Sequence, residues 1–206
     1  QQGEVDGAEE QFEKAKDIFK KLNFGREEAI TLGEIARIKK DKGEVDEALR
    51  LHQERIQTFD KLGDTREKAV TLGDIARIKV SKGEVDEALR LHQERIQTFD
   101  KLGDTRSKAV AYRDIARIKV SKGEVDEALQ IHQEGLKIFD KLGDSREKAI
   151  TLGDIARIKV DKGEVDEALR LHQEELDVYD KLGDTRSKAV TLGDIARIKK
   201  DKGEAD

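Results

Sequence analysis

The sequence predicts an all-α protein in which antiparallel helix pairs stack into an α-solenoid. Three observations lead to this fold class. A 40-residue unit repeats along the 206 residues without an insertion. Apolar residues within each unit recur at three- and four-residue steps, as they do on one face of an α-helix. Charged residues make up 42% of the chain with a net charge of only −5, which is typical of solvent-facing helices carrying ion pairs.

The repeat is marked by the string Gly-Glu-Val-Asp, which begins at residues 3, 43, 83, 123 and 163 and returns as Gly-Glu-Ala-Asp at Gly203. Residues 41–80 and 81–120 are identical at 35 of 40 positions. A single globular core would not place the same residue at every fortieth position, whereas a stack of equivalent units would. We therefore expect one solenoid over residues 1–206, with units at 3–42, 43–82, 83–122, 123–162 and 163–202 and the start of a further unit at 203–206.

Each unit contains a first helix, expected from about Thr65 to Lys82 in the second unit. Its apolar side carries Ala69, Leu72, Ile75, Ala76 and Ile78. Asp64 is positioned to cap its N-terminus, with Glu67 three residues later completing an acidic capping box. Gly83 then ends the helix.

A second helix is expected from about Glu84 to Leu102, followed by Gly103 as a left-handed C-cap. Its apolar stripe consists of Val85, Ala88, Leu89, His92, Ile96 and Phe99. The connections are only a few residues long, so consecutive helices must be antiparallel. One such hairpin cannot bury its own apolar stripes, and the chain should therefore stack ten helices in all.

The composition excludes several classes of function. Because the chain has no cysteine, it can form no disulfide, thiolate or cysteine-ligated metal site. No apolar run is long enough to cross a membrane, and no signal peptide opens the chain. The net charge is negative and each unit matches its cations with acids, which argues against nucleic-acid binding. We expect a cytoplasmic protein without a cofactor.

The stretches Thr71-Leu72-Gly73-Asp74-Ile75-Ala76 and Gly83-Glu84-Val85-Asp86-Glu87-Ala88 resemble the tetratricopeptide repeat. Ile75 and Ala76 match the family's Leu-Gly/Ala pair, and Ala88 its packed alanine. The 40-residue length is similar to the extended repeats of kinesin light chains and bacterial signalling proteins. Lys79 departs from the family's frequent tyrosine, and the closing proline is missing. The resemblance implies a right-handed superhelix and a concave groove, lined by first helices, that takes peptides or partner proteins.

The histidines offer the chain's main candidates for metal binding, and we expect none. His52, His92, His132 and His172 occupy one repeat position on the stripe of the second helix, so that neighbours lie about 10 Å or more apart. We interpret them as semi-buried packing residues with one ring nitrogen satisfied. The Gly-Asp-Thr-Arg segments lack the features of a phosphate-binding loop, and no Ser/His/Asp arrangement stands out. We expect no catalysis in this chain.

A row on the other side of the first helix is the candidate binding site. Residues equivalent to Val70, Asp74 and Arg77 recur in every unit on the face opposite the core stripe. Two interpretations stay open: these acids and arginines pair with one another within and across units, or the row forms the docking surface, and the two are compatible. The acidic and basic members selected as candidate partner-binding residues are Asp74, Arg77, Asp114, Arg117, Asp154, Arg157, Asp194 and Arg197.

The third unit breaks the pattern, because Ala111-Tyr112-Arg113 replaces Thr-Leu-Gly. Arg113 is expected to add a cation to the groove side, and Tyr112 an aromatic ring where other units have leucine. Tyrosine and arginine are frequent in binding hot spots, so both are included among the candidate residues. Drift after duplication is the alternative explanation.

The last helix keeps Leu192, Ile195 and Ile198 although no partner helix follows in the sequence given. An apolar end then matches an apolar start, which predicts head-to-tail association between copies. Three functions follow. The preferred one is a non-catalytic scaffold that binds a peptide or partner protein in the groove. The alternatives are a self-assembling module, stacked end to end, and a regulatory arm of a larger signalling enzyme.

Overall fold

The computed structural model describes residues 2–203, and side chains from Val5 onward. This part of the chain is all α-helical, with ten helices and no strand. The helices fall into two compact units that meet at the boundary between Gly103 and Asp104. The first contains α1 (Gln2–Lys21), α2 (Gly25–Asp41), α3 (Val45–Leu62), α4 (Thr65–Ser81) and α5 (Val85–Lys101). The second contains α6 (Thr105–Ser121), α7 (Val125–Leu142), α8 (Ser145–Asp161), α9 (Val165–Leu182) and α10 (Thr185–Lys202).

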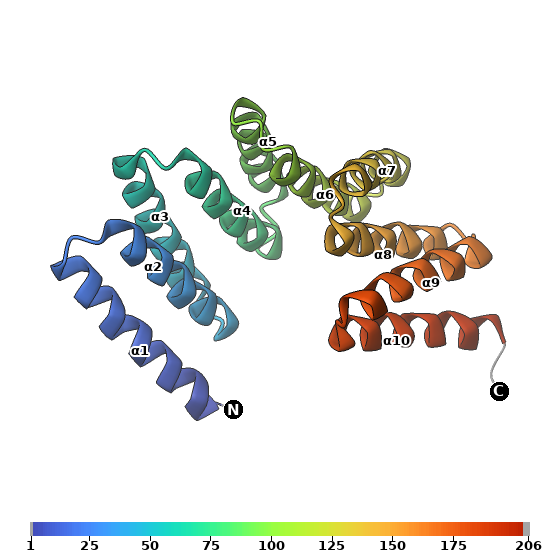
Figure 1. Ribbon diagram of the computed structural model, residues 1–206, viewed down its shortest axis with the longest axis horizontal. Helices are drawn as coiled ribbons and strands as arrows, with labels where there is room; N and C mark the ends of the chain where they lie inside the picture. The colour runs from blue at the N-terminus through green and yellow to red at the C-terminus, as the bar shows by residue number, and fades with distance from the viewer. Residues whose placement is uncertain (1, 204–206) are drawn as a thin grey trace. The chain divides into compact units, whose positions relative to one another are not determined.

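Within each unit, consecutive helices run antiparallel and pack on one another (Figure 1). Even-numbered helices are the first helices of the repeats, and odd-numbered helices are the second helices. The prediction of an all-α helical-repeat solenoid built from antiparallel pairs is confirmed, and helix bounds differ from the expected ones by one or two residues in the internal repeats. A single solenoid over the whole chain stays a prediction.

The core follows from small and branched residues at repeating positions. One cluster joins Leu32, Ile35 and Ala36 of α2 to Ala48 and Leu51 of α3, with Ile78 of α4 closing it. The same layout recurs in the second unit, where Ala116, Ala128 and Ile158 come from α6, α7 and α8. Within the units, α3, α7 and α9 therefore each lie between two first helices, and the alanines of α3 and α7 allow close approach of the preceding first helix.

Aspartate caps explain where four of the first helices begin. The side chain of Asp64 accepts a hydrogen bond from the backbone N–H of Glu67 at 3.1 Å, and Asp104, Asp144 and Asp184 do the same at α6, α8 and α10. The predicted cap at Asp64 is confirmed. Helix α2 lacks such a cap, because Phe24 occupies its N-cap position and makes no side-chain hydrogen bond to the helix. Its first backbone N–H groups are thus left to solvent.

The turns after the second helices need a left-handed residue. Gly63, Gly143 and Gly183 have φ of 67–68° and cap α3, α7 and α9. Asn23 occupies this position after α1 with φ of 58°, which asparagine tolerates better than most residues. None of the helices described is both long enough and apolar enough to cross a bilayer.

Candidate functional site

The predicted row of first-helix residues lies along a furrow between neighbouring first helices, floored by the second helix between them. We call this furrow the first-helix groove. In the first unit it opens into a cavity of about 300 Å³ between α2 and α4, over α3. Arg37, Asp74 and Arg77 form part of its walls, and His52 and Arg55 of α3 form part of its floor.

The second unit repeats this arrangement with α8 and α10 over α9. A cavity of about 490 Å³ is lined by Arg157, Asp194 and Arg197, with His172 at its base. These positions are equivalent to those around the first-unit cavity. A further cavity of about 350 Å³ lies toward the N-terminal ends of the same helices, and Ile150, Val190 and Arg117 contribute to its lining. The groove thus offers both aliphatic and charged groups along its length.

Ion pairs connect the groove residues of the second unit across successive first helices. Arg117 of α6 donates to the carboxylate of Asp154 on α8, with Nε–Oδ2 at 2.9 Å. Asp154 also accepts from Arg157 at 3.2 Å, and Arg157 reaches Asp194 of α10 at 3.4 Å. Arg197 then pairs with Asp194. Asp154 is nearly buried, whereas the arginines keep about half or more of their side chains exposed. The expected pairing therefore occurs, and the guanidinium groups still face solvent.

The first unit pairs its groove charges differently. Asp74 accepts from Arg77 at 2.8 Å on its own helix and from Arg55 of α3 at 3.2 Å. Arg37 pairs with Glu34 three residues earlier at 2.6 Å. The acid of α4 is thus held from the floor of the groove, whereas the equivalent acids of α8 and α10 accept from an arginine of the preceding first helix.

The location of Arg113 corrects the sequence-based expectation. Only 7% of this residue is exposed, so it does not add a free cation to the groove. Its guanidinium lies 5.9 Å from the ring centroid of Phe139 on α7 and pairs with Glu147 of α8. In the first unit this position over the phenylalanine is held by an arginine of the second helix, Arg55 over Phe59 or Arg95 over Phe99.

The first and second helices exchange residue types at this site, because one supplies a long side chain and the other a glycine. Where Arg95 comes from the second helix, the first helix has Gly73, and a Cβ there would lie 2.6 Å from the guanidinium carbon. In the second unit of the structure, the first helix α6 supplies Arg113, and the second helix that follows it, α7, has Gly135. One long side chain and one glycine therefore share the space in both cases. This coupled change was missed in the sequence, although position 135, 22 residues after Arg113, also departs from the arginine found at positions 55 and 95.

The other third-repeat candidates have mixed surroundings. Tyr112 is 37% exposed, whereas the leucine at the same position of α8, Leu152, is 1% exposed. Asp114 is nearly buried, at 8%. Neither lines one of the cavities described above. Among the candidate residues, the structure thus places Asp74, Arg77, Arg117, Arg157, Asp194 and Arg197 at the groove cavities, and Asp154 between Arg117 and Arg157.

All four histidines are buried, more deeply than the semi-buried state expected, and His52 and His172 lie at the floor of groove cavities. Nδ1 of His92 accepts from Arg95 and Nδ1 of His172 donates to Glu175, each at 2.8 Å. Nδ1 of His52 and His132 has no hydrogen-bond partner among the described residues, so the expected satisfied nitrogen is not found at these two. Burial lowers the pKa of each of these two to about 4, with nearby arginines acting in the same direction and Asp74 or Asp154 opposing them. Both are neutral at pH 7. No group of metal-binding side chains occurs within the described part of the chain.

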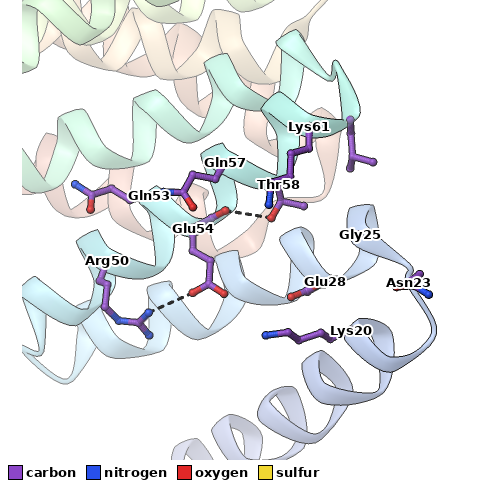
Figure 2. Close-up of a pocket in the computed structure, with 11 residues that line it drawn as sticks. Lys20, Asn23, Gly25, Glu28, Arg50, Gln53, Glu54, Gln57, Thr58 and Lys61 are labelled. Atoms are coloured by element: carbon purple, nitrogen blue, oxygen red, sulfur yellow. Dashed lines mark hydrogen bonds and ion pairs between the residues drawn. The ribbon is translucent and has the colours of Figure 1, made fainter.

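A larger cavity of about 610 Å³ lies on the side of the second helices, between α1 and α3 (Figure 2). Its walls are polar. Lys20, Arg50 and Lys61 bring positive charge, and Arg50 is held by Glu54 at 3.2 Å. Thr58 turns its hydroxyl back to the carbonyl of Glu54 at 3.1 Å. None of the sequence-predicted residues lies here.

Comparison with known proteins agrees with the fold. Residues 67–141 match the family model described as tetratricopeptide repeat. BtubC (BKLC) from P. vanneervenii has a similar structure, with a TM-score of 0.73 and 14% identity over 98% of this chain and 93% of that one. A Podosopora anserina putative kinesin light chain with nearly identical TPR-like repeats gives 0.64 and 22%, covering 89% and 90%.

A Rap protein complexed with Competence and Sporulation Factor is also similar, with a TM-score of 0.63 and 17% identity over 97% of this chain and 60% of that one. The search among proteins of curated function found no matching sequence.

Proposed function

We propose that this chain, whose residues 67–141 match the tetratricopeptide-repeat family model, is a non-catalytic scaffold that binds a peptide or partner protein in the first-helix groove. The single observation that supports this most is the recurrence of the same cavity at equivalent positions in both units, over His52 and over His172. A surface feature that repeats with the sequence suits an extended ligand, because such a ligand can place one side chain in each cavity.

The chemistry of the groove fits a peptide. Aliphatic side chains such as Ile30 and Val190 are about half exposed, although they are apolar. They lie close to arginines whose carboxylate partners fix their geometry without covering them. Exposed apolar groups provide binding energy, and fixed guanidinium groups provide direction by hydrogen bonding to carboxylates and carbonyls. The similar Rap structure holds a bound factor, which adds support for a peptide or protein ligand.

The test is selection of a random peptide library on the immobilised chain, followed by titration of the enriched peptides against matched variants. Arg157→Ala removes a groove guanidinium that is 54% exposed and pairs with the acid three residues earlier. Arg170→Ala is its control on the second-helix side, because Arg170 is 59% exposed and pairs with Glu167 in the same way. Arg77→Ala and Arg90→Ala form the same comparison in the first unit.

We expect the groove variants to weaken binding of enriched peptides about tenfold or more, the range for loss of a hot-spot side chain, while the controls leave it unchanged. All four variants should keep the helical content of the parent, since each residue is exposed. Equal binding by groove and control variants would contradict the proposal, as would a library that yields no enriched peptide.

A further inference from the structure

The two groove cavities at equivalent positions, over His52 and over His172, differ in charge. Among their lysine, arginine, aspartate and glutamate residues, the first has four cations and two acids, which are Arg37, Lys40, Arg55, Arg77, Glu34 and Asp74. The second has two cations and three acids, which are Arg157, Arg197, Asp161, Asp194 and Asp201. The cavity over His52 is therefore net positive, and the cavity over His172 is net negative.

Part of this difference comes from two positions where the repeats diverge. Val160 of the second unit stands where the first unit has Lys40, and Asp201 stands where it has Ser81. Both changes make the cavity over His172 more negative. Each of these residue types also occurs at the same position in another repeat, so the helix pair folds with either one.

Two of the three acids keep their charge available to a ligand. Asp161 and Asp201 are exposed and make no ion pair within the described residues. Asp194, by contrast, pairs with both Arg157 and Arg197. The negative charge that is left in this cavity therefore lies at Asp161 and Asp201.

The floor and the helix ends act in the same direction. His172, which lines the cavity, is bonded to Glu175 at 2.8 Å, and this glutamate replaces the cation Arg55 of the first-unit floor. Asp161 and Asp201 lie in the last turns of α8 and α10, where carbonyl groups carry partial negative charge. A cation at this end of the groove is thus favoured by side chains and by the backbone.

Three lysines at the same helix ends direct their charge elsewhere. They pair with acids of the second helices and the turns before them, as Lys159–Glu164 at 2.6 Å, Lys162–Asp126 at 2.8 Å and Lys202–Asp166 at 2.9 Å. None of the three lines the cavity over His172. They therefore do not neutralise its acids.

The walls of this cavity also define what kind of cation fits. Val160 and Ile198 contribute apolar surface. Lysine and arginine bury their methylene stems along such surface and keep the charged head in polar surroundings. No group of acidic or histidine side chains in the described part of the chain is arranged to hold a metal ion. The lining suits a long organic cation.

We propose that the cavity over His172 takes the side chain of a lysine or arginine of the bound peptide, and that the equivalent cavity over His52 does not. This inference rests on the proposed function, because it identifies one residue class of the peptide that the groove binds. The sign of the charge in each cavity is what separates the two positions.

The neighbouring cavity in the second unit gives the peptide a direction. That cavity, toward the N-terminal ends of α8 and α10, is lined by four arginines and two acids, which are Arg117, Arg146, Arg157, Arg186, Glu175 and Asp184. It repels a cation, so the lysine or arginine lies toward the C-terminal ends of these helices. Arg157 borders both cavities, and its loss removes a hydrogen-bond donor from the positive one.

The test starts from peptides enriched on the parent chain from a random 12-residue library. Each lysine and arginine of an enriched peptide is replaced singly by glutamine, which keeps a polar side chain without the charge. Parent and replaced peptides are titrated against the parent chain, Asp161→Asn and Asp201→Asn. Glu134→Gln is the matched control, because Glu134 is an exposed acid of the same unit that lines none of the cavities described.

We expect one basic position of the peptide to lose about two- to fivefold in affinity on replacement by glutamine, the range for one partly exposed ion pair. The same loss should shrink in Asp161→Asn and in Asp201→Asn and stay unchanged in Glu134→Gln. Val160→Lys, which introduces the first-unit residue, should weaken the basic peptide by a similar factor and leave its glutamine version unaffected. Lys40→Gln in the first unit should change neither.

Enriched peptides without a lysine or arginine overturn the inference, as does a glutamine replacement that costs the same in all four chains. If Arg157→Ala weakens binding while Asp161→Asn, Asp201→Asn and Val160→Lys leave it unchanged, the groove binds the peptide and only the charge assignment is wrong. A library that yields no enriched peptide removes the proposed function and this inference together. Circular dichroism verifies that each variant keeps the helical content of the parent, as expected for substitutions at the rim.

Discussion

Exchanging Arg113 and Gly135 tests the reciprocal packing in the third repeat. The perturbation is a double-mutant cycle of Arg113→Gly, Gly135→Arg and the double variant. The double variant restores the arrangement of the second repeat, where Gly73 faces Arg95 and Arg95 lies 5.9 Å from the ring centroid of Phe99. It also places an arginine three residues after His132, as Arg95 follows His92 and donates to its Nδ1.

The single variants should both destabilise. Arg113→Gly loses about 0.8 kcal/mol in helix propensity. It also removes the contact with Phe139, which is worth about 0.5–2 kcal/mol for a cation over a ring. Glu147 loses one partner but keeps Arg106 at 3.1 Å, so we take the full loss as about 3 kcal/mol rather than that of an isolated buried charge. Gly135→Arg brings a second guanidinium into occupied space, and overpacking costs about 1–3 kcal/mol.

The assay is urea unfolding of the four proteins at one low concentration, with mass verified as monomeric. We expect the double variant to lie within about 1 kcal/mol of the parent, and the coupling free energy to reach about 3 kcal/mol or more, whereas independent sites add to within about 0.5 kcal/mol. Additive single effects would refute the reasoning, because they would mean that Arg113 and Gly135 do not share one space.

Three further measurements test the same structure. His52 and His132 have a pKa of about 4 in the folded chain against about 6.5 in the unfolded chain, so the free energy of unfolding is highest above pH 6.5 and decreases as pH falls toward 4. Urea unfolding should show a loss of about 2 kcal/mol per histidine at pH 5. Leucine at both positions should abolish this pH dependence. Gly193→Ala should stabilise the fold by about 0.8 kcal/mol, since no atom lies within 4 Å of the added Cβ. Gly73→Ala should be less favourable than Gly193→Ala by about 1 kcal/mol or more, because the guanidinium of Arg95 occupies the space of its Cβ. Equal effects of the two variants in thermal melts would contradict this. Phe24→Asp supplies the cap missing from α2 and should raise the free energy of unfolding by about 1 kcal/mol, and an unchanged midpoint would show that solvent already satisfies this terminus.

The fold was predictable because the sequence pattern of one helix pair occurs five times in the chain. Each repeat confirms the others, so that the glycine turns and the apolar steps place the internal helices to within one or two residues. The groove row was predictable as well, since Asp74 and Arg77 share one helix face by periodicity alone. The ion-pair partners of these residues were not predictable. Whether Asp74 takes Arg55 from the floor, or Asp154 takes Arg117 from the neighbouring first helix, depends on how two helices are rotated against each other.

The buried position of Arg113 escaped the sequence analysis for the same reason. Helical periodicity within one segment does not show that position 113 and position 135 share a space. Comparison of the repeats at an offset of 22 residues contains the signal, because Gly33–Arg55, Gly73–Arg95, Arg113–Gly135 and Gly153–Glu175 each combine one glycine with one long side chain. The column accounts for one histidine nitrogen, since Gly135 leaves His132 without the partner that Arg95 or Glu175 provides. It does not account for His52, because Arg55 stands at the same position and donates to Asp74.

These pairs suggest a rule for how nearly identical repeats diverge. A change at a covered position is tolerated when its spatial partner changes too, as at Arg113 and Gly135. Lys20 and Glu28 likewise reverse the signs of Asp60 and Lys68, which pair at 2.8 Å one repeat later.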